Sequence, residues 1–276
     1  MRSATTTAPP RDGTWHAWLD PWNLGAMATV LGLDYALKRF ASHASAAELD
    51  FLLAPTAACV QLLTGYSFVA ERGAGYFSRE TLVMILPACA GVNFAVIAFT
   101  TLAACFLPRF RSWRAKLGGT IGAGMLAYGA TVSANGTRIA LGLAIGRHGP
   151  FAPMMPAAAL HRVVGVVVYL TALLALSAVV GRVLRAKATP VALPLSAYLA
   201  VTLATPFLGG ASASRLFCRH AGVVLGLTAL AAAVVWLPHK AYAVAFTRWI
   251  RRAKRRARLP RGLGRARRDR ERPLPG

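Results

Sequence analysis

Long apolar runs separated by short polar stretches dominate the hydrophobic pattern of this chain. Seven apolar segments lie at about residues 23–37, 51–69, 87–107, 117–135, 161–180, 190–208 and 221–237. All except the first approach the ~20 residues that a helix needs to cross ~30 Å of hydrocarbon. The runs are rich in Ala, Leu and Gly and lack polar/apolar alternation, which favours helices over strands. The pattern predicts an all-α, polytopic transmembrane bundle of about seven spans, within a range of six to eight.

The composition agrees with that of a membrane protein. Of all residues, 56% are hydrophobic and 15% are charged, and the mean hydropathy is +0.49. A soluble fold could not cover this much apolar surface. We expect a polar N-terminal segment at 1–20, a transmembrane bundle at 21–238 and a basic tail at 239–276. The N-terminal segment has no basic stretch followed directly by an apolar core, so we expect the first span, not a cleaved signal peptide, to direct insertion.

Basic residues fall at alternate connections of the predicted bundle. They gather at 38–39, 109–116, 182–187 and in the tail, where 248–272 holds more than a third of all Lys and Arg. The positive-inside rule predicts that these stretches are cytoplasmic and that the N-terminus faces outward. The connections that then face outward are 70–86, 138–160 and 209–220. We expect the tail to contact anionic lipid rather than nucleic acid, although its charge alone is compatible with either.

Arg138 stands out among the charged residues. It follows the apolar segment at 117–135, and no acidic residue lies within about fifty positions of it on either side. An unpaired charge at the end of a membrane segment is costly, and this marks Arg138 as a candidate functional residue. Cys89 and His161 also lie at the ends of apolar segments. The predicted alternation of loops places all three side chains at one depth on the outer side of the membrane.

Two further cysteines and a pair of glycines in the apolar runs have simple structural explanations. Cys59 and Cys105 lie within apolar runs and are expected to be core residues. Because no Cys-x-x-Cys pair is present, we expect neither a metal site nor a cofactor. The spacing of Gly118 and Gly122 would let two helices approach closely.

A thiol, a guanidinium and an imidazole at one point could carry out acyl transfer. The Cys89 thiol would attack as the thiolate, a form that a nearby cation or helix N-terminus favours. His161 could take the thiol proton and return it to a leaving amine. Arg138 could stabilise an oxyanion, hold the thiolate or clamp a carboxylate. The structural alternatives are a packing cysteine, an interfacial histidine and an arginine that snorkels to the headgroups.

Two non-enzymatic interpretations are compatible with the same residues. A small transporter or channel would use Arg138 to bind an anionic ligand and would have no need of Cys89. A scaffold would use the basic tail to recruit an anionic partner.

Three motifs follow one another in the middle of the chain. They are Pro-Ala-Cys89-Ala-Gly-Val-Asn-Phe94, Ala-Asn135-Gly-Thr-Arg138-Ile and Leu-His161-Arg-Val-Val-Gly165-Val-Val-Val-Tyr169. Together they resemble the exosortase/archaeosortase family of membrane cysteine transpeptidases. The Cys-Ala-Gly-Val-Asn-Phe form, with Pro55 and Gly75-Tyr76 upstream, is most similar to the exosortase K subtype. The resemblance covers about 51–180, which would form the catalytic core.

The resemblance assigns a role to each of these residues. Cys89 matches the family's nucleophile, Arg138 its essential arginine and His161 its third catalytic residue. Asn135 matches an asparagine often found before the arginine, although a helix cap is its structural alternative. Asn93 would line the same site, four residues from Cys89 on one helical face, or serve helix packing alone.

One feature of the third motif departs from the family pattern. Related sequences often have an acidic residue beside the histidine, whereas this chain has Val163-Val164. A carboxylate that orients His161 would have to come from a distant part of the chain, and Glu71 and Glu80 on the connection at 70–86 are the candidates. That connection could equally be a solvated turn or a flap that grips the substrate.

The resemblance implies a multi-pass enzyme of the bacterial inner membrane with an extracytoplasmic active site. It would act as a cysteine peptidase and transpeptidase in protein sorting. Its substrates would be exported proteins that end in a short motif, a transmembrane helix and a basic cluster. The freed acyl group would pass to an acceptor, which the motifs do not specify, at the outer face.

Overall fold

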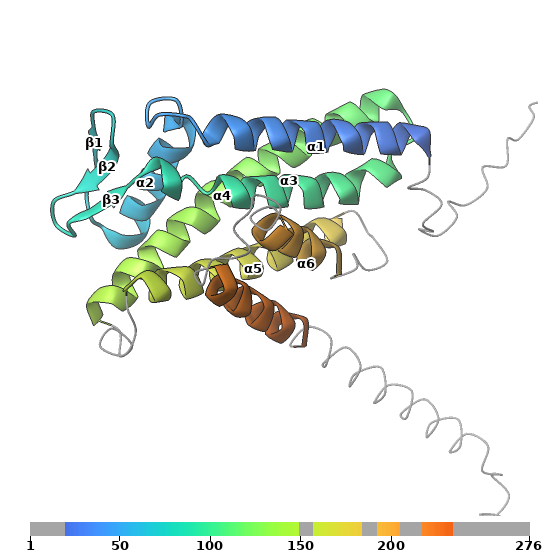
Figure 1. Ribbon diagram of the computed structural model, residues 1–276. Coiled ribbons are helices and arrows are strands. Elements are labelled where there is room, and N and C mark those ends of the chain that lie inside the picture. The colour runs from blue at the N-terminus through green and yellow to red at the C-terminus, as the bar shows by residue number, and fades with distance from the viewer. Residues whose placement is uncertain (1–19, 149–156, 184–191, 205–216, 234–276) are drawn as a thin grey trace, which may run out of the picture. The chain divides into compact units, whose positions relative to one another are not determined.

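The protein is mostly helical. The structure is a computed structural model, and it describes residues 20–148, 157–183, 192–204 and 217–233 (Figure 1). Its helices are α1 (Pro21–Ala41), α2 (Asp50–Thr64), α3 (Val92–Phe106), α4 (Trp113–His148), α5 (Ala157–Val183), α6 (Ala192–Leu199) and Phe217–Ala233. Shorter elements are the strands β1 (Val69–Glu71), β2 (Gly75–Ser78) and β3 (Val83–Ile85), the 3₁₀ turns η2 (Pro87–Cys89) and η3 (Leu107–Arg109), and the π-helical turn η4 (Ala200–Ala204).

The predicted helical class is confirmed, whereas the predicted number of spans stays a prediction. Two described stretches, Pro87–Arg109 and Leu160–Val183, are long and apolar enough to cross a membrane. The apolar helices Asp50–Thr64, Leu193–Leu203 and Phe217–Ala233 are shorter. Residues 1–19 of the segment predicted at 1–20, and the whole tail predicted at 239–276, lie outside the described residues.

α3 is buried along most of its length because it is apolar on every side. It contacts α1, α4, α5 and α6. Gly91 is the N-cap residue of α3 and lies in the left-handed region, with a φ of 76°. A change of chain direction there separates α3 from the short turn η2 before it.

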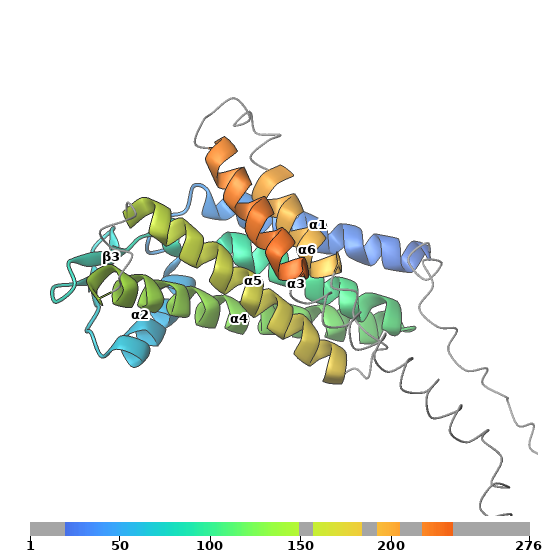
Figure 2. The same cartoon turned by 90° about the horizontal axis from the view of Figure 1, so that it is seen from below.

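α4 is the longest helix, with 36 residues, and thus extends about 54 Å at 1.5 Å per residue. The prediction that the fourth segment ends at 135 is wrong, because the helix continues through Arg138 to His148. Asn135 is therefore not a helix cap. α5 returns alongside α4 and contacts it (Figure 2).

α2 packs along the C-terminal half of α4 through small residues. A Cβ on Gly136 would lie 2.5 Å from the Sγ of Cys59, so only glycine fits at this crossing. Around Gly118 and Gly122, by contrast, no atom of the described residues lies within 4 Å of an added Cβ. The close approach predicted at that pair is not found in the part of the chain that the structure describes. Cys105 is buried in α3, as predicted.

α1 runs antiparallel to α3. At its start, the Lys116 ammonium donates to the side chain of Asn23 and lies 3.7 Å from the carboxylate of Asp20. Nearer its end, Asp34 accepts a hydrogen bond from Thr100 of α3. The last turn of α1, with Lys38 and Arg39, therefore lies toward the opposite end of α3 from Lys116.

The predicted sidedness stays a prediction, but one part of it conflicts with this arrangement of α1 and α3. The stretches 38–39 and 109–116 cannot both face the cytoplasm if α1 and α3 cross the membrane. Both views show the sheet, the end of α4 and the start of α5 at one end of the helices, and the start of α4 at the other (Figures 1 and 2).

The connection predicted at 70–86 folds into a small antiparallel sheet of order β1-β2-β3. Val69 pairs with Phe77 across the first hairpin, and Tyr76 pairs with Ile85 across the second. A Cβ on Gly75 would lie 2.1 Å from the carbonyl oxygen of Ile85, so the sheet closes only around glycine at that position. Ile85 and Phe68 join residues of α2 in one hydrophobic cluster, which fixes the sheet to the helices.

Candidate functional site

Cys89 lies in the short turn between the sheet and α3. β3 ends at Ile85, and Cys89 closes η2 by donating its backbone N–H to the carbonyl of Leu86 at 2.7 Å. The side chain of Cys89 is half-buried and not part of a disulfide. The expected break after Pro87 is thus present, and Cys89 stands just before the N-terminus of α3.

Asn135 links this turn to α4 and α5. It is completely buried in α4, and its side-chain amide donates to the backbone carbonyl of Cys89. Its Oδ1 accepts a hydrogen bond from the hydroxyl of Tyr169 on α5 at 2.9 Å. A Cβ on Gly91 would lie 3.2 Å from the side chains of Asn135 and Thr131, so the start of α3 is pressed against α4.

Arg138 and His161 contact each other across the α4–α5 interface. The Nη1 of Arg138 lies 3.2 Å from the Nε2 of His161. Because a guanidinium can only donate, the Nε2 must accept, which requires a neutral imidazole with its proton on Nδ1. Within the described residues, no carboxylate pairs with either side chain, and the buried Nε of Arg138 has no hydrogen-bond partner.

Tyr169 supports both halves of this network. Its ring stacks on Phe94 of α3, with centroids 4.9 Å apart. The guanidinium carbon of Arg138 lies 5.5 Å from the centre of the same ring, within the range of a cation–π contact. A continuous set of contacts therefore runs from the Cys89 backbone through Asn135 and Tyr169 to Arg138 and His161.

The contacts of Tyr169 with Asn135 and Arg138 were not predicted from the sequence. His161, Gly165 and Tyr169 repeat at intervals of four and so share one ridge of α5. A Cβ on Gly165 would lie 3.4 Å from the Cδ of Arg138, so this glycine leaves room for the arginine. The spacing of four after His161 was the available signal.

Three predicted supporting residues do not join the network. Asn93 is exposed in the first turn of α3, and Gly91 separates that turn from Cys89, so the two residues do not share a helical face. Glu71 is exposed at the end of β1. Glu80 accepts hydrogen bonds from the backbone and hydroxyl of Ser67 at 3.1 and 2.6 Å. Among the described residues no ion pair joins Glu71 or Glu80 to His161, and their role in orienting it stays a prediction.

The contacts reach Cys89 through its backbone carbonyl. In the described part of the chain, no hydrogen bond joins its Sγ to His161 or Arg138. The same part of the chain holds no group of three or more His, Cys, Asp or Glu side chains that could bind a metal ion.

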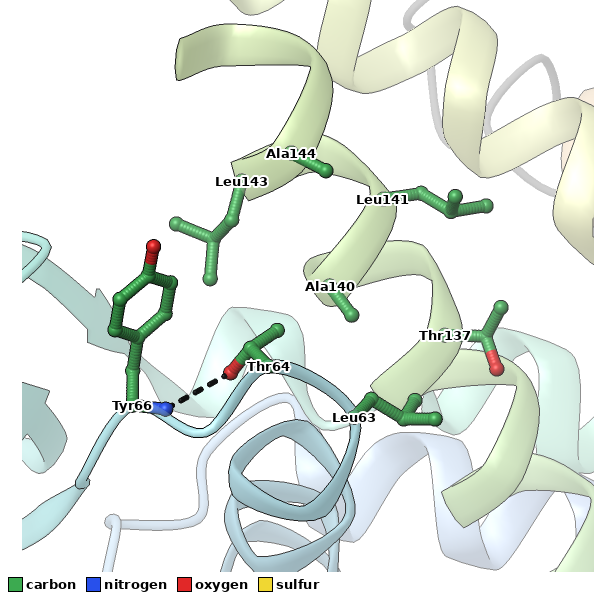
Figure 3. A pocket seen from close by; sticks show the side chains of 8 residues that line it. All are labelled: Leu63, Thr64, Tyr66, Thr137, Ala140, Leu141, Leu143 and Ala144. Atoms are coloured by element: carbon green, nitrogen blue, oxygen red, sulfur yellow. Dashed lines mark hydrogen bonds between the residues drawn. The ribbon is translucent and has the colours of Figure 1, made fainter. Parts of the chain in front are cut away.

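A cavity of about 360 Å³ lies beside the site, between the end of α2 and the C-terminal part of α4 (Figure 3). Its lining is mostly apolar and consists of Leu63, Thr64, Tyr66, Thr137, Ala140, Leu141, Leu143 and Ala144. Neighbouring helix residues diverge by about 100°, so Thr137 faces this cavity while Arg138 faces α5. The cavity could hold an apolar group without contact to the guanidinium.

Comparisons of this chain with protein-family models, with curated proteins and with solved structures find no match.

Proposed function

We propose that this protein is a membrane-embedded cysteine transpeptidase of the exosortase type, which cleaves C-terminal sorting signals of exported proteins. The observation that carries the proposal is the set of contacts from Cys89 through Asn135 and Tyr169 to Arg138 and His161. These residues come from the η2 turn, α4 and α5, which are distant from one another in sequence. Packing alone would not require a cation, an imidazole and a cysteine turn to meet.

The proposed reaction begins with the Cys89 thiolate attacking the scissile carbonyl of the substrate. An Sγ–C bond forms, the peptide C–N bond breaks, and the leaving amine takes the proton removed from the thiol. The resulting thioester is resolved by an acceptor nucleophile at the outer face, or by water. No metal or cofactor is needed for these steps.

Arg138 and His161 would act in sequence. In the structure, the Nε2 of His161 contacts the Nη1 of Arg138. An oxyanion or substrate carboxylate that takes over the guanidinium donors would free Nε2 to accept the thiol proton. The unpartnered Nε of Arg138 is a further donor available to such an oxygen.

The proposed orientation places the network at the outer face of a bacterial inner membrane. The stretches at 109–116 and 182–187 and the basic tail would be cytoplasmic by the positive-inside rule. α1 begins beside Lys116, which supports a cytoplasmic N-terminus and an even number of crossings in place of seven. α2 and the sheet would then remain on the outer side.

The test is processing of an exported protein from the same genome that ends in a short motif, a transmembrane helix and a basic cluster. Cys89→Ala is expected to abolish removal of this signal while the protein remains in the membrane at normal level. Cys218→Ala, which changes an exposed free cysteine, is the matched control and should process normally. Normal maturation in the Cys89→Ala strain would refute the proposal.

A second candidate is a transporter or channel for an anionic ligand. The buried, unpartnered Nε of Arg138 specifically favours it, since a carboxylate could fill that position. Cys89→Ser separates the two functions. A transporter should tolerate the serine, whereas a cysteine acyltransferase should lose activity, because a hydroxyl is a far weaker nucleophile than a thiolate.

A further inference from the structure

β3 is a sheet edge that leads directly into the cysteine turn. The strand order β1-β2-β3 leaves one side of β3 without a partner strand among the described residues. The extended backbone continues through Leu86, with φ −91° and ψ 166°, and Pro87 then begins the turn that ends at Cys89. A chain paired with this edge would therefore lie alongside the approach to Cys89.

Met84 presents its backbone groups to the free side of β3. The carbonyl of Ile85 points toward β2, because a Cβ on Gly75 would lie 2.1 Å from its oxygen. Along a strand in an antiparallel ladder, successive residues direct their N–H and C=O groups to opposite sides. The N–H and C=O of Met84 therefore point away from β2 and are available to another chain.

Apart from its length of three residues, the β3 edge lacks the features that usually prevent strand addition. Exposed edges are commonly protected by charged residues, proline or bulges, and Val83, Met84 and Ile85 supply none of these. The other edge, β1, ends in the charged pair Glu71 and Arg72.

The side chains next to the β3 edge are apolar. Because side chains alternate along an extended chain, Met84 and Leu86 share one face, and Leu82 lies in the turn just before β3. Leu82 is 79% exposed and Leu86 is 43% exposed. Leu82 also has a φ of 56°, in the left-handed region that leucine rarely adopts. The edge thus offers backbone hydrogen bonds flanked by exposed apolar side chains.

We propose that the free edge of β3 binds an extended, uncharged segment of the substrate as an added strand and so aligns the scissile bond with Cys89. The proposal rests on the proposed function, and it names how that site holds its peptide. Strand addition takes affinity from backbone hydrogen bonds and specificity from alternate side chains. Ile85 and Cys89 are four positions apart, so a peptide paired at Met84 needs about four or five further residues to reach the thiol at ~3.3 Å per residue.

The test measures alkylation of Cys89 in the full-length protein in lipid nanodiscs. Acetyl-hexaalanine chloromethyl ketone, long enough to pair at Met84 and reach the thiol, is compared with chloroacetone, which has the same reactive group without the peptide. In both reactions the Sγ of Cys89 bonds to the methylene carbon and chloride leaves, so no acyl transfer is required. Rates are read by mass spectrometry of the Cys89 peptide.

Met84→Pro removes the outward N–H, and a proline is tolerated at an edge position that does not pair inward. We expect it to slow the peptide probe about tenfold, as the loss of one or two hydrogen bonds would do, while the chloroacetone rate is unchanged. Met84→Ala keeps the N–H and should react with the peptide probe at close to the original rate.

The proposal is overturned if the peptide probe reacts with the original protein no faster than chloroacetone, or if Met84→Pro leaves its rate unchanged. Should Met84→Pro slow both reagents, the original protein is tested with probes that are N-methylated at one amide at a time. One methylation position must then slow alkylation severalfold, and equal rates for all probes would refute strand addition. Failure of the Cys89→Ala processing test would refute the enzyme but not this binding mode.

Discussion

At the residue scale, Asn135 connects the candidate nucleophile to the candidate cation. Its amide group donates to the Cys89 carbonyl, and its carbonyl oxygen accepts from Tyr169, whose ring also faces Arg138. Buried polar side-chain atoms nearly always have a hydrogen-bond partner, and both the amide nitrogen and the oxygen of the completely buried Asn135 have one. Asn135 therefore holds the cysteine turn at a fixed position relative to α4 and α5.

Tyr169→Phe tests this positioning role. The change removes the hydroxyl, leaves Oδ1 of Asn135 without its donor, and keeps the stack on Phe94. An unsatisfied buried acceptor costs about 1–3 kcal/mol, and the Cys89 turn should become less well held. We expect kcat for processing to fall about tenfold with little change in KM, because the substrate-binding surface is not altered. Steady-state kinetics with purified substrate check this, and an unchanged kcat would contradict it.

Gly91→Ala tests the close packing of the start of α3 against Asn135, with Gly65→Ala as a matched control. The two glycines have nearly the same φ, 76° and 75°, so alanine should cost each about 1–2 kcal/mol in backbone strain. Only at Gly91 would the new Cβ also press on Asn135 and Thr131, at 3.2 Å, since nothing lies within 4 Å at Gly65.

We therefore expect both variants to lower the melting temperature, and Gly91→Ala to lower it further and to reduce processing strongly. Thermal unfolding in detergent and the processing assay measure the two effects. Equal stability and equal activity of the two variants would show that the contact with Asn135 is unimportant.

The sequence was sufficient to select Cys89, Arg138 and His161 as candidates, because each lies at the end of an apolar run and carries reactive chemistry. The geometry brings Arg138 and His161 into contact, and it links Cys89 through its backbone. Tyr169 could not be selected in the same way. An aromatic residue within an apolar helix is usually a core residue, and only its contacts with Asn135 and Arg138 distinguish it.

At the element scale, α2 contains a proline whose missing N–H is compensated from α4. Pro55 cannot donate to the carbonyl of Phe51 four positions earlier. The hydroxyl of Tyr128 donates to that carbonyl instead, at 2.7 Å. The proline thus creates a specific tie between α2 and α4, close to the crossing at Gly136.

A double-mutant cycle tests the tie. Tyr128→Phe should destabilise the protein by about 1 kcal/mol, the usual net value of such a hydrogen bond. In a Pro55→Ala background, alanine supplies the helical N–H to Phe51, so the same change should cost little. Chemical unfolding of the four proteins in detergent gives the coupling energy. Independent, additive effects would show that Tyr128 does not compensate for the proline.

Two elements differ from the sequence-based prediction for physical reasons. The stretch Asn135-Gly136-Thr137 is typical of a helix end, but in α4 the glycine lies within the helix because Cys59 of α2 leaves no space for a side chain. The three strands are only three or four residues long. Strands this short carry too little alternation to be recognised before the sheet is seen.

At the scale of the whole molecule, the charge of one basic pair and the packing of α1 favour opposite sides of the membrane for that pair. Lys38 and Arg39 follow an apolar run and were predicted to be cytoplasmic. α1 begins beside Lys116 and runs antiparallel to α3, so its last turn lies toward the Cys89 end. Two basic residues are a weak topological signal when a larger block, 109–116, lies at the opposite end.

Cysteine accessibility in spheroplasts tests the orientation. In a protein whose four native cysteines are replaced by alanine, His43→Cys would place a thiol in the exposed turn after α1, and Arg111→Cys would place one in the basic stretch before α4. Pro87–Arg109 has 23 residues and extends about 35 Å, enough to separate its two ends across ~30 Å of hydrocarbon. An impermeant maleimide added outside should therefore label His43→Cys at once and Arg111→Cys only after lysis. Labelling of His43→Cys only after lysis would support the orientation predicted from charge. The end of α1 would then not lie on the outer side with Cys89.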